Sequence, residues 1–176
     1  MSTFDDLKDC PSWPEDFAQR YRQAGYWRDE TFGDLLRSAA QAFAEREALT
    51  EGEQHLSYRQ LDLRVDQLAA GLYRLGLRAG DNVVLQLPNS AAFVEVCFAL
   101  YRLGVRPIFA LPAHRHLEIG RFCEFARARA YFCADRDASF DYRAMARDLK
   151  DRNPQLEWVV VLSLIHISEP TRPERI

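Results

Sequence analysis

The feature of this chain that most restricts its fold is a regular alternation of short apolar strands with helical segments from residue 82 onward. Strands are predicted at residues 82–87, 107–111, 130–134 and 156–161. Helical spacing of apolar residues lies between them, at residues 90–103, near 117–126 and at 141–150. Such alternation is typical of right-handed βαβ crossovers and of a parallel sheet with helices on both faces. We therefore predict an α/β fold with a partial doubly wound parallel sheet.

The first part of the chain is predicted to form two helices outside that alternation. Residues 13–22 begin like a helix, with Pro14 in the first turn, and Gly25 ends it. A second helix is expected from the cap residue Thr31 to about Phe43. We expect residues 1–30 to be an N-terminal extension that packs on the main domain, and residues 31–161 to form that domain.

A hairpin and a long helix are predicted next. Residues 48–50 and 55–57 flank a polar turn, as in a short hairpin. Ser57 and Gln60 have the spacing of a capping box, in which each side chain accepts from a backbone N–H of the first turn. Apolar residues then recur at helical spacing until Gly76, a favourable residue at a helix end.

Composition excludes several classes of protein. The hydrophobic fraction of 48% is ample for a packed core, which argues against disorder. A net charge of −3 offers no electrostatic basis for binding nucleic acid or an anionic membrane. No apolar run approaches the roughly 20 residues of a membrane span, and the N-terminus lacks the regions of a signal peptide. We expect a soluble cytoplasmic protein.

The cysteines favour structural thiols over a metal centre. They are Cys10, Cys97, Cys123 and Cys133, and no two form a C-x-x-C pair. Cys97 lies in an apolar run, where a thiol behaves as a small hydrophobic group. We therefore expect reduced cysteines and no zinc site.

The last stretch of the chain differs from the rest. Residues 162–172, written back as codons, are similar to a translated transposase-type sequencing-library adapter, and a variable index read would account for residues 173–175. We expect residues 162–176 to be a non-native tail and exclude them from the fold prediction. On this interpretation the gene product is cut short and any chemistry encoded downstream is missing.

Few residues carry a chemical motif. The chain has no phosphate loop, no G-x-G-x-x-G, no G-x-S-x-G and no H-E-x-x-H. The best candidate is His114, Arg115 and His116, just after a predicted strand, where ligands bind in open α/β sheets. Such a cluster could meet an anion or a metal. We favour an ordinary exposed loop, because a His-x-His pair lacks a third ligand.

Three further features have a structural and a functional interpretation. Glu95, in an apolar helix, could be a tuned acid or base, but we favour an outward side chain or a pair with Arg102 or Arg106. Asp62 and Asp66, near Arg59 and Arg64, are explained by a solvated helix face. Tyr26 and Trp27 could be a contact surface, but tethering of the N-terminal segment is the commoner use of such aromatics.

Three segments resemble core motifs of the acyl-adenylate-forming superfamily, which includes acyl-CoA synthetases, luciferases and adenylation domains. Residues 56–61 (LSYRQL) resemble its first motif, L-[ST]-Y-x-[EQ]-L. Residues 80–89 (GDNVVLQLPN) resemble its G-D-x-V-x-[LI]-x-x-x-N stretch. Residues 100–107 (LYRLGVRP) resemble its second motif, although Tyr101 replaces the usual basic residue. The resemblance extends from Trp13 to Val161 and implies the incomplete N-terminal part of the large domain of such an enzyme.

Other segments resemble the aryl-acid-activating branch that serves catechol siderophores. They are residues 13–17 (WPEDF), 21–27 (YRQAGYW) and 109–115 (FALPAHR). The resemblance implies that ATP, with Mg²⁺, activates 2,3-dihydroxybenzoate as its acyl-AMP. It also implies transfer of the acyl group to the phosphopantetheine thiol of an aryl carrier protein. Salicylate-activating relatives share these segments, so salicylate is the alternative substrate, and other acyl-AMP or acyl-CoA ligases are further alternatives.

The resemblance assigns no catalytic, cofactor-binding or metal-binding residue within this chain. The phosphate loop and its Lys, the Asn of the aryl pocket, the ribose-binding Asp and the C-terminal catalytic Lys of the family would all follow Val161. We therefore expect the 176-residue product to be inactive and, because of its exposed sheet edge, prone to aggregate. The alternative from another class is a stand-alone, non-catalytic α/β binding module.

Overall fold

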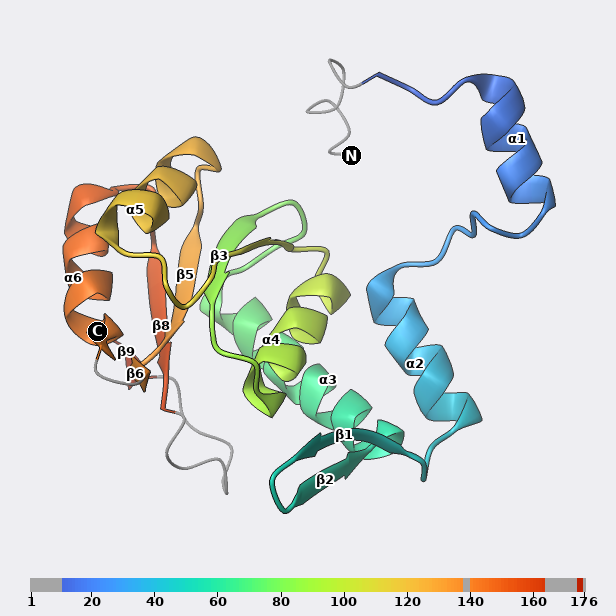
Figure 1. The fold of residues 1–176 in the computed structure, drawn as a ribbon, viewed down its shortest axis with the longest axis horizontal. Coiled ribbons are helices and arrows are strands. Elements are labelled where there is room, and N and C mark those ends of the chain that lie inside the picture. Colours follow the sequence, from blue (N-terminus) through green and yellow to red (C-terminus); the bar gives the residue numbers. More distant parts are fainter. Residues whose placement is uncertain (1–10, 138–139, 164–173, 176) are drawn as a thin grey trace.

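The computed structural model of this protein describes residues 11–137, 140–163 and 174–175 (Figure 1). The helices of this part are α1 (Glu15–Gln23), α2 (Phe32–Ala42), α3 (Tyr58–Leu75), α4 (Ala91–Arg102), α5 (His116–Phe125) and α6 (Tyr142–Arg152). The strands are β1 (Glu47–Glu51), β2 (Gln54–Ser57), β3 (Asn82–Gln86), β4 (Arg106–Phe109), β5 (Ala130–Ala134), β6 (Arg136–Asp137), β7 (Phe140–Asp141), β8 (Trp158–Leu162) and β9 (Glu174–Arg175).

The main sheet has the strand order β4-β3-β5-β8-β9. Its first four strands are parallel, and β9 pairs antiparallel with β8. The chain leaves β3 toward one side to form β4, then returns past β3 to form β5 on the other side. This reversal is the topological switch point of a doubly wound sheet. The predicted fold class is confirmed.

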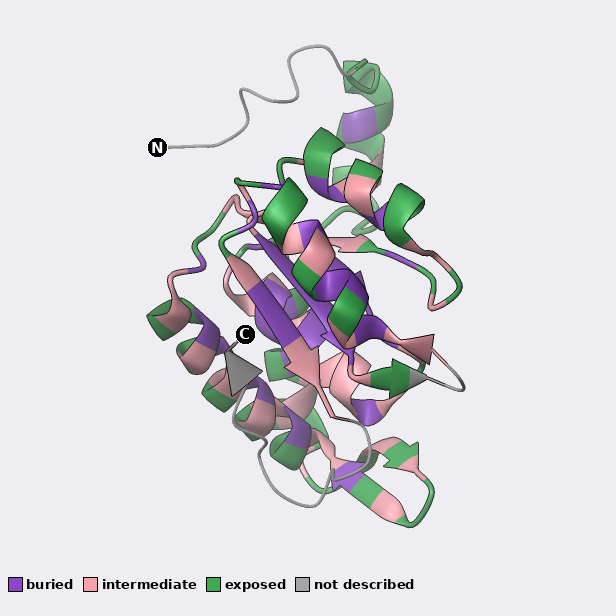
Figure 2. Ribbon diagram, turned by 90° about the vertical axis from the view of Figure 1, so that its left-hand side faces the viewer, coloured by how far each residue is buried: buried purple, intermediate pink, exposed green. Residues whose placement is uncertain are grey.

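Helices cover both faces of the sheet, with α3 and α4 on one side and α5 and α6 on the other (Figure 1). The residues Val83, Val84 and Leu85 of β3 are fully buried, and all five residues of β5 are buried (Figure 2). A strand that is covered on both faces carries apolar residues at consecutive positions rather than in alternation. This explains why the predicted strands read as continuous apolar runs.

The predicted helix ends are confirmed at several caps. Thr31 accepts a hydrogen bond from the Asp34 N–H, 3.1 Å away, at the start of α2. Ser57 and Gln60 form the predicted capping box of α3. Gly76 ends that helix with φ +115°, a backbone conformation that side chains with a Cβ disfavour.

The differences from the predicted elements are small and local. The strand predicted at 82–87 ends at Gln86, and the one predicted at 156–161 occupies Trp158–Leu162. The short hairpin of β6 and β7 was not predicted, because two-residue strands leave no measurable alternation. The hairpin predicted around residues 48–57 is confirmed as β1 and β2.

The N-terminal segment, residues 11–30, places α1 away from the main sheet (Figure 1). Its aromatic residues contact one another, with Trp27 5.8 Å from Trp13 and 5.5 Å from Tyr21 between ring centroids. Arg20 lies over the ring of Phe17 at 4.5 Å. The described aromatic contacts of α1 therefore lie within its own segment, and packing of this segment on the main domain stays a prediction.

Within the described residues, no helix combines the length and the apolar character that crossing a membrane requires.

Candidate functional site

The candidate site lies at the carboxyl ends of β3 and β5, where the direction of the chain reverses. Open α/β sheets bind their ligands in the crevice at this point. Three segments meet here: the end of β3, the loop of residues 110–115 between β4 and α5 (the β4–α5 loop), and the turn after β5. The predicted His114 and Arg115 belong to the second of these.

Gln86, at the end of β3, connects the sheet to the β4–α5 loop. Its side chain is buried, and its Nε2 donates to the carbonyl of Leu111 at 2.8 Å and to that of His114 at 3.0 Å. Its Oε1 accepts a hydrogen bond from the hydroxyl of the fully buried Tyr131 on β5. Burial raises the pKa of Tyr131, so the hydroxyl stays a donor at neutral pH. The amide is thus engaged at both ends.

His114 and Arg115 bind their own loop. The Nδ1 atom of His114 accepts from the backbone N–H of Leu111 at 3.1 Å, and its ring meets Phe122 of α5 edge-on. Arg115 donates to the carbonyls of Pro112 and His114. Its guanidinium also lies 3.9 Å from the ring centroid of Phe140. These contacts support the interpretation of an ordinary strand-to-helix loop, although His114 and Arg115 are half-buried in it rather than exposed.

His116 does not join this pair in a common site. Its Nε2 lies 3.6 Å from the Asp148 carboxylate of α6, on the outer surface. Among the described residues, no group of three His, Cys, Asp or Glu side chains has the arrangement of a metal site.

The acidic side chains at this edge are also engaged. Asp141 caps α6 by accepting from the Arg143 N–H at 3.0 Å, and it receives Nη2 of the same arginine at 2.7 Å. Those bonds lower the pKa of Asp141. Asp135 accepts from the Arg136 N–H at 2.7 Å and from Ser163 Oγ at 3.0 Å. Within the described residues, the polar side chains named here bind one another or the backbone, and no cluster of three His, Cys, Asp or Glu side chains could hold Mg²⁺. The described residues therefore do not fit ATP and its metal by themselves.

Glu95 is paired, but with a partner that the sequence did not indicate. Its Oε1 lies 3.0 Å from Nη1 of Arg64 on α3, so the expected pair with Arg102 or Arg106 is wrong. Arg64 lies on α3 and Glu95 on α4, and packing of these two helices against each other creates the pair. This ion pair between two packed helices gives Glu95 a structural role rather than that of a catalytic acid or base.

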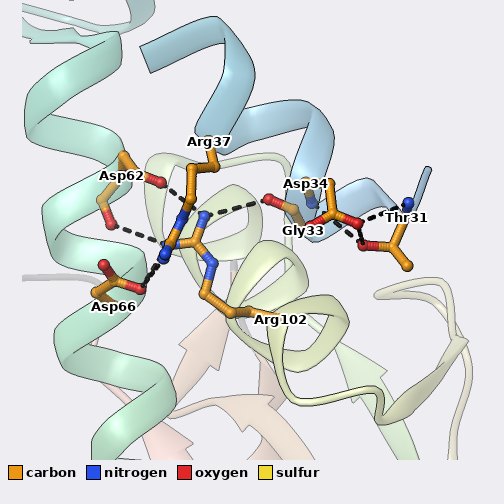
Figure 3. A network of polar contacts seen from close by, with 7 residues as sticks. All are labelled: Thr31, Gly33, Asp34, Arg37, Asp62, Asp66 and Arg102. Carbon is orange, nitrogen blue, oxygen red and sulfur yellow. Dashed lines mark hydrogen bonds and ion pairs between the residues drawn. The ribbon is translucent and has the colours of Figure 1, made fainter. Parts of the chain in front are cut away.

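The solvated interpretation is wrong for Asp62, whose side chain is 20% exposed, and holds only in part for Asp66, whose side chain is 45% exposed. Arg102 of α4, with its side chain only 12% exposed, donates to Asp62 Oδ1 and Asp66 Oδ1, each at 2.6 Å (Figure 3). It reaches the carbonyl of Gly33 on α2 at 3.3 Å as well. We call these four residues the Arg102 network. It joins three helices, and Arg37 of α2 adds a contact to Asp66 at 2.8 Å.

Tyr26 lies at the edge of an open groove of about 620 Å³ between the N-terminal segment and the start of β4. This residue is 76% exposed. Phe32 stacks on Tyr101 at 4.8 Å in the same groove. Trp27 instead packs within its own segment, as described above. The lining of the groove is mixed: aromatic and apolar side chains stand beside the polar side chains of Arg28, Glu30 and Arg106. Arg28 and Glu30 form an ion pair of 3.3 Å.

The described cysteines are buried and unreactive in character. Cys97, Cys123 and Cys133 are free thiols. Burial raises the pKa of Cys123 and that of Cys133 to about 12, which keeps both protonated at neutral pH. This agrees with structural thiols; Cys10 lies outside the described residues.

The residue that sequence reasoning missed is Gln86. It interrupts the apolar run of residues 83–87 (VVLQL) in a predicted strand, and that contrast was the available signal. A single polar residue inside an apolar run requires a partner. Its partners are two backbone carbonyls 25 and 28 residues away, which no local pattern reveals.

Comparison with known proteins gives a consistent result. The family model described as AMP-binding enzyme matches residues 36–174. A 2,3-dihydroxybenzoate-AMP ligase of Bacillus subtilis is 51% identical over 155 residues, which are 88% of this chain and 29% of that protein. A salicyl-AMP ligase/salicyl-S-ArCP synthetase of Mycobacterium tuberculosis is 42% identical over 154 residues, 85% of this chain and 27% of that protein.

A solved structure shows the same fold. The apo structure of Mycobacterium smegmatis MbtA superposes with a TM-score of 0.79 at 35% sequence identity, over 94% of this chain and 32% of that one. The present chain thus spans less than a third of the length of these relatives.

Proposed function

The chain belongs to the AMP-binding enzyme family, and from that premise we propose that it forms the N-terminal part of a 2,3-dihydroxybenzoate–AMP ligase of siderophore biosynthesis. The observation that carries this proposal is the 51% identity to such a ligase over nearly the whole chain. The β4–α5 loop, whose sequence resembles the aryl-acid branch, is also the segment in which two backbone carbonyls accept hydrogen bonds from Gln86.

The proposed reaction has two steps. An oxygen of the aryl carboxylate attacks the α-phosphorus of ATP, the bond to the β-phosphate oxygen breaks, and pyrophosphate leaves with Mg²⁺. The thiol of a phosphopantetheine group on an aryl carrier protein then attacks the acyl carbon, loses its proton and releases AMP. A carboxylate is a poor electrophile until one of its oxygens carries such a leaving group. Catalysis therefore depends on positioning and on charge stabilisation.

In this proposal the described residues support the site without touching the substrate. Gln86, Arg115 and the caps of the helices fix the carboxyl edge of the sheet. ATP, Mg²⁺, the aryl acid and the carrier protein would be held by other parts of the enzyme. We propose the cytoplasm as its compartment, because ATP is available there.

Salicylate is the second candidate substrate. It is favoured by the 42% identity to a salicyl-AMP ligase, only moderately below that of the dihydroxybenzoate enzyme. The two acids differ by a single hydroxyl group. A site that hydrogen-bonds that hydroxyl can reject the analogue without it by a large factor.

The experiment has two parts. The source DNA is first resequenced across the codons for Val160 to Arg172, without a library adapter, and the protein it encodes is purified. ATP–pyrophosphate exchange is then measured with 2,3-dihydroxybenzoate, with salicylate and with benzoate. We expect exchange to be fastest with 2,3-dihydroxybenzoate and absent for the 176-residue chain. Faster exchange with salicylate would reassign the substrate, and a genomic stop codon in this region would refute the ligase.

A further inference from the structure

The groove of about 620 Å³ lies at the start of β4, at the other end of that strand from the candidate site. Its walls come from the N-terminal segment, from the beginning of α2 and from the turn between α4 and β4. β4 begins at Arg106, in this groove, and ends at Phe109, next to the β4–α5 loop. Open α/β sheets bind the ligands of their principal site at the carboxyl ends of the strands. The groove is therefore a separate feature of the molecule.

Aromatic rings form one part of the groove. Phe32 stacks on Tyr101, with 4.8 Å between the ring centroids and 30° between the ring planes. Phe32 is nevertheless 60% exposed, and Tyr26, which also lines the groove, is more exposed still. An exposed ring offers a flat apolar surface, on which another ring packs at a centroid distance of about 4.5–7 Å. The groove can therefore accept a planar aromatic group.

Charged side chains form another part. The lining includes two arginines and one glutamate, Arg28, Arg106 and Glu30, which give the groove a charge of +1 in a chain of net charge −3. The side chain of Arg28 is 69% exposed, and its Nη2 lies 3.3 Å from Oε2 of Glu30. Arg106 donates through Nη2 to the carbonyl of Gly80 at 2.7 Å, which fixes its guanidinium beside the groove. The groove thus attracts anions more than its surroundings do.

The geometry of Arg28 favours a carboxylate. A guanidinium carries five N–H donors in a planar fork, so an ion pair made through Nη2 leaves other donors for a second acceptor. This fork matches the two oxygens of a carboxylate. The carboxylate of Glu30 already lies against it, which marks the place that an incoming carboxylate would take.

The size of the groove suits a small molecule. Ligand sites in proteins measure about 300–1,000 Å³ and combine apolar or aromatic walls with a few charged groups that fix orientation. A groove of about 620 Å³ with three aromatic residues and two arginines has both properties. An aromatic ring that carries a carboxylate satisfies the two kinds of lining together, whereas a neutral ring or an aliphatic acid satisfies only one.

We propose that this groove binds a small aromatic carboxylate, whose ring packs against Phe32 and Tyr26 and whose carboxylate replaces that of Glu30 at Arg28. The ligand class follows from the lining of the groove. The proposal does not rest on the proposed function, because the groove lies at the amino end of β4 and requires neither ATP nor Mg²⁺.

The test uses the 176-residue chain and salicylate, an aromatic carboxylate that is itself fluorescent. Fluorescence anisotropy of salicylate is followed as the chain is added, and other compounds are then used to displace it. Benzoate, which keeps the ring and the carboxylate, should displace salicylate. Salicylamide keeps the ring without the charge, and cyclohexanecarboxylate keeps the charge without the flat ring, so both should compete poorly. Added salt should weaken binding, because it screens an exposed guanidinium.

Substitutions of the charged residues should act in opposite directions. Arg28→Gln should weaken salicylate binding about tenfold, the effect of losing one hydrogen bond to a charged group. Arg28→Lys keeps the charge and should restore part of the affinity. Glu30→Gln should tighten binding, because it removes the competing carboxylate. The matched control is Arg59→Gln, since Arg59 is also 69% exposed and pairs with Glu45 at 2.8 Å outside the groove; it should leave the affinity unchanged.

The aromatic part has its own pair of variants. Phe32→Ala should weaken binding about fivefold through loss of ring packing. Phe43→Ala removes an exposed ring that does not line the groove and should have no effect.

Several results would overturn the proposal. They are the absence of saturable salicylate binding, displacement by salicylamide as strong as by benzoate, and weaker binding by Glu30→Gln. Sedimentation of the chain as a dimer that Phe32→Ala dissociates, without salicylate binding, would assign the groove to a second copy instead. Failure of the complete protein to catalyse ATP–pyrophosphate exchange would count against the proposed function and leave this site unaffected.

Discussion

At the scale of single residues, Gln86 joins the centre of the sheet to the loop that follows β4. Replacing it with Leu removes both donor bonds and leaves the hydroxyl of Tyr131 buried without its acceptor. Each buried group that loses its partner costs about 1–3 kcal/mol. We expect Gln86→Leu to lower the free energy of unfolding by about 3 kcal/mol in urea denaturation. The control, Gln60→Leu at the exposed α3 cap, should cost about 1 kcal/mol, and equal losses would contradict this role.

Arg127 holds a conformation that favours glycine. It follows α5 with φ +47°, and its side chain is exposed. The left-handed region costs residues with a Cβ roughly 1 kcal/mol. We expect Arg127→Gly to raise the free energy of unfolding by up to about 1 kcal/mol, and Arg127→Ala, which keeps the Cβ, to leave it unchanged. Thermal melts of the two variants side by side decide this, and a gain shared by both would point to the charge instead.

At the scale of helices and strands, the Arg102 network holds α2, α3 and α4 together. Removing this partly buried charge takes away the ion-pair partner of Asp62, whereas Asp66 keeps Arg37 and, being 45% exposed, gains water contact. We expect Arg102→Met to lower the free energy of unfolding by about 2 kcal/mol. Arg37→Met removes a surface pair to the same carboxylate and should cost less than about 0.5 kcal/mol. Guanidinium unfolding of both variants tests this, and similar losses would show that the network is a surface feature.

The cap of α6 predicts a pH dependence. Its hydrogen bonds to Arg143 lower the pKa of Asp141 relative to the unfolded chain. A lowered folded-state pKa stabilises the protein above the unfolded value, about 3.9, and this stabilisation is lost as the pH falls below it. We expect the melting temperatures of the wild type and Asp141→Asn to differ at pH 6 and to converge toward pH 2. A difference that stays constant over this range would exclude the charge as its cause.

The elements that were predicted correctly are those with a local signal. The capping residues Thr31 and Ser57 and the apolar run of β5 mark their own boundaries. The pairs that were predicted wrongly are long-range, since Arg102 meets Asp66 across 36 residues and Arg64 meets Glu95 across 31. Acidic residues four positions apart on a helix look solvated whether or not another helix covers them. Only the packing of α3 on α4 distinguishes the two cases.

At the scale of the whole molecule, the N-terminal segment forms an aromatic cluster of its own. Trp13 and Trp27 belong to it, and Trp158 belongs to the sheet. The Trp158→Phe variant keeps Trp13 and Trp27 as its tryptophans, so its fluorescence reports on the N-terminal segment. We expect this fluorescence to change at a lower urea concentration than the helical circular dichroism, because few contacts join the segment to the core. Coincident transitions would show that residues 1–30 unfold with the main domain, as the predicted packing on that domain requires.

The position of β3 between β4 and β5 has a consequence for synthesis on the ribosome. Its pairing with β4 spans about two dozen residues, whereas β5 comes nearly fifty residues after it. The nearer pair closes the shorter chain loop and emerges first. The edge of β3 that later pairs with β5 therefore stays unpaired and exposed until α5 and the first half of β5 have been translated. The protein is therefore most at risk of misfolding while the last residue to have left the ribosome lies between residues 110 and 130. Chaperones should bind nascent chains most strongly at this stage.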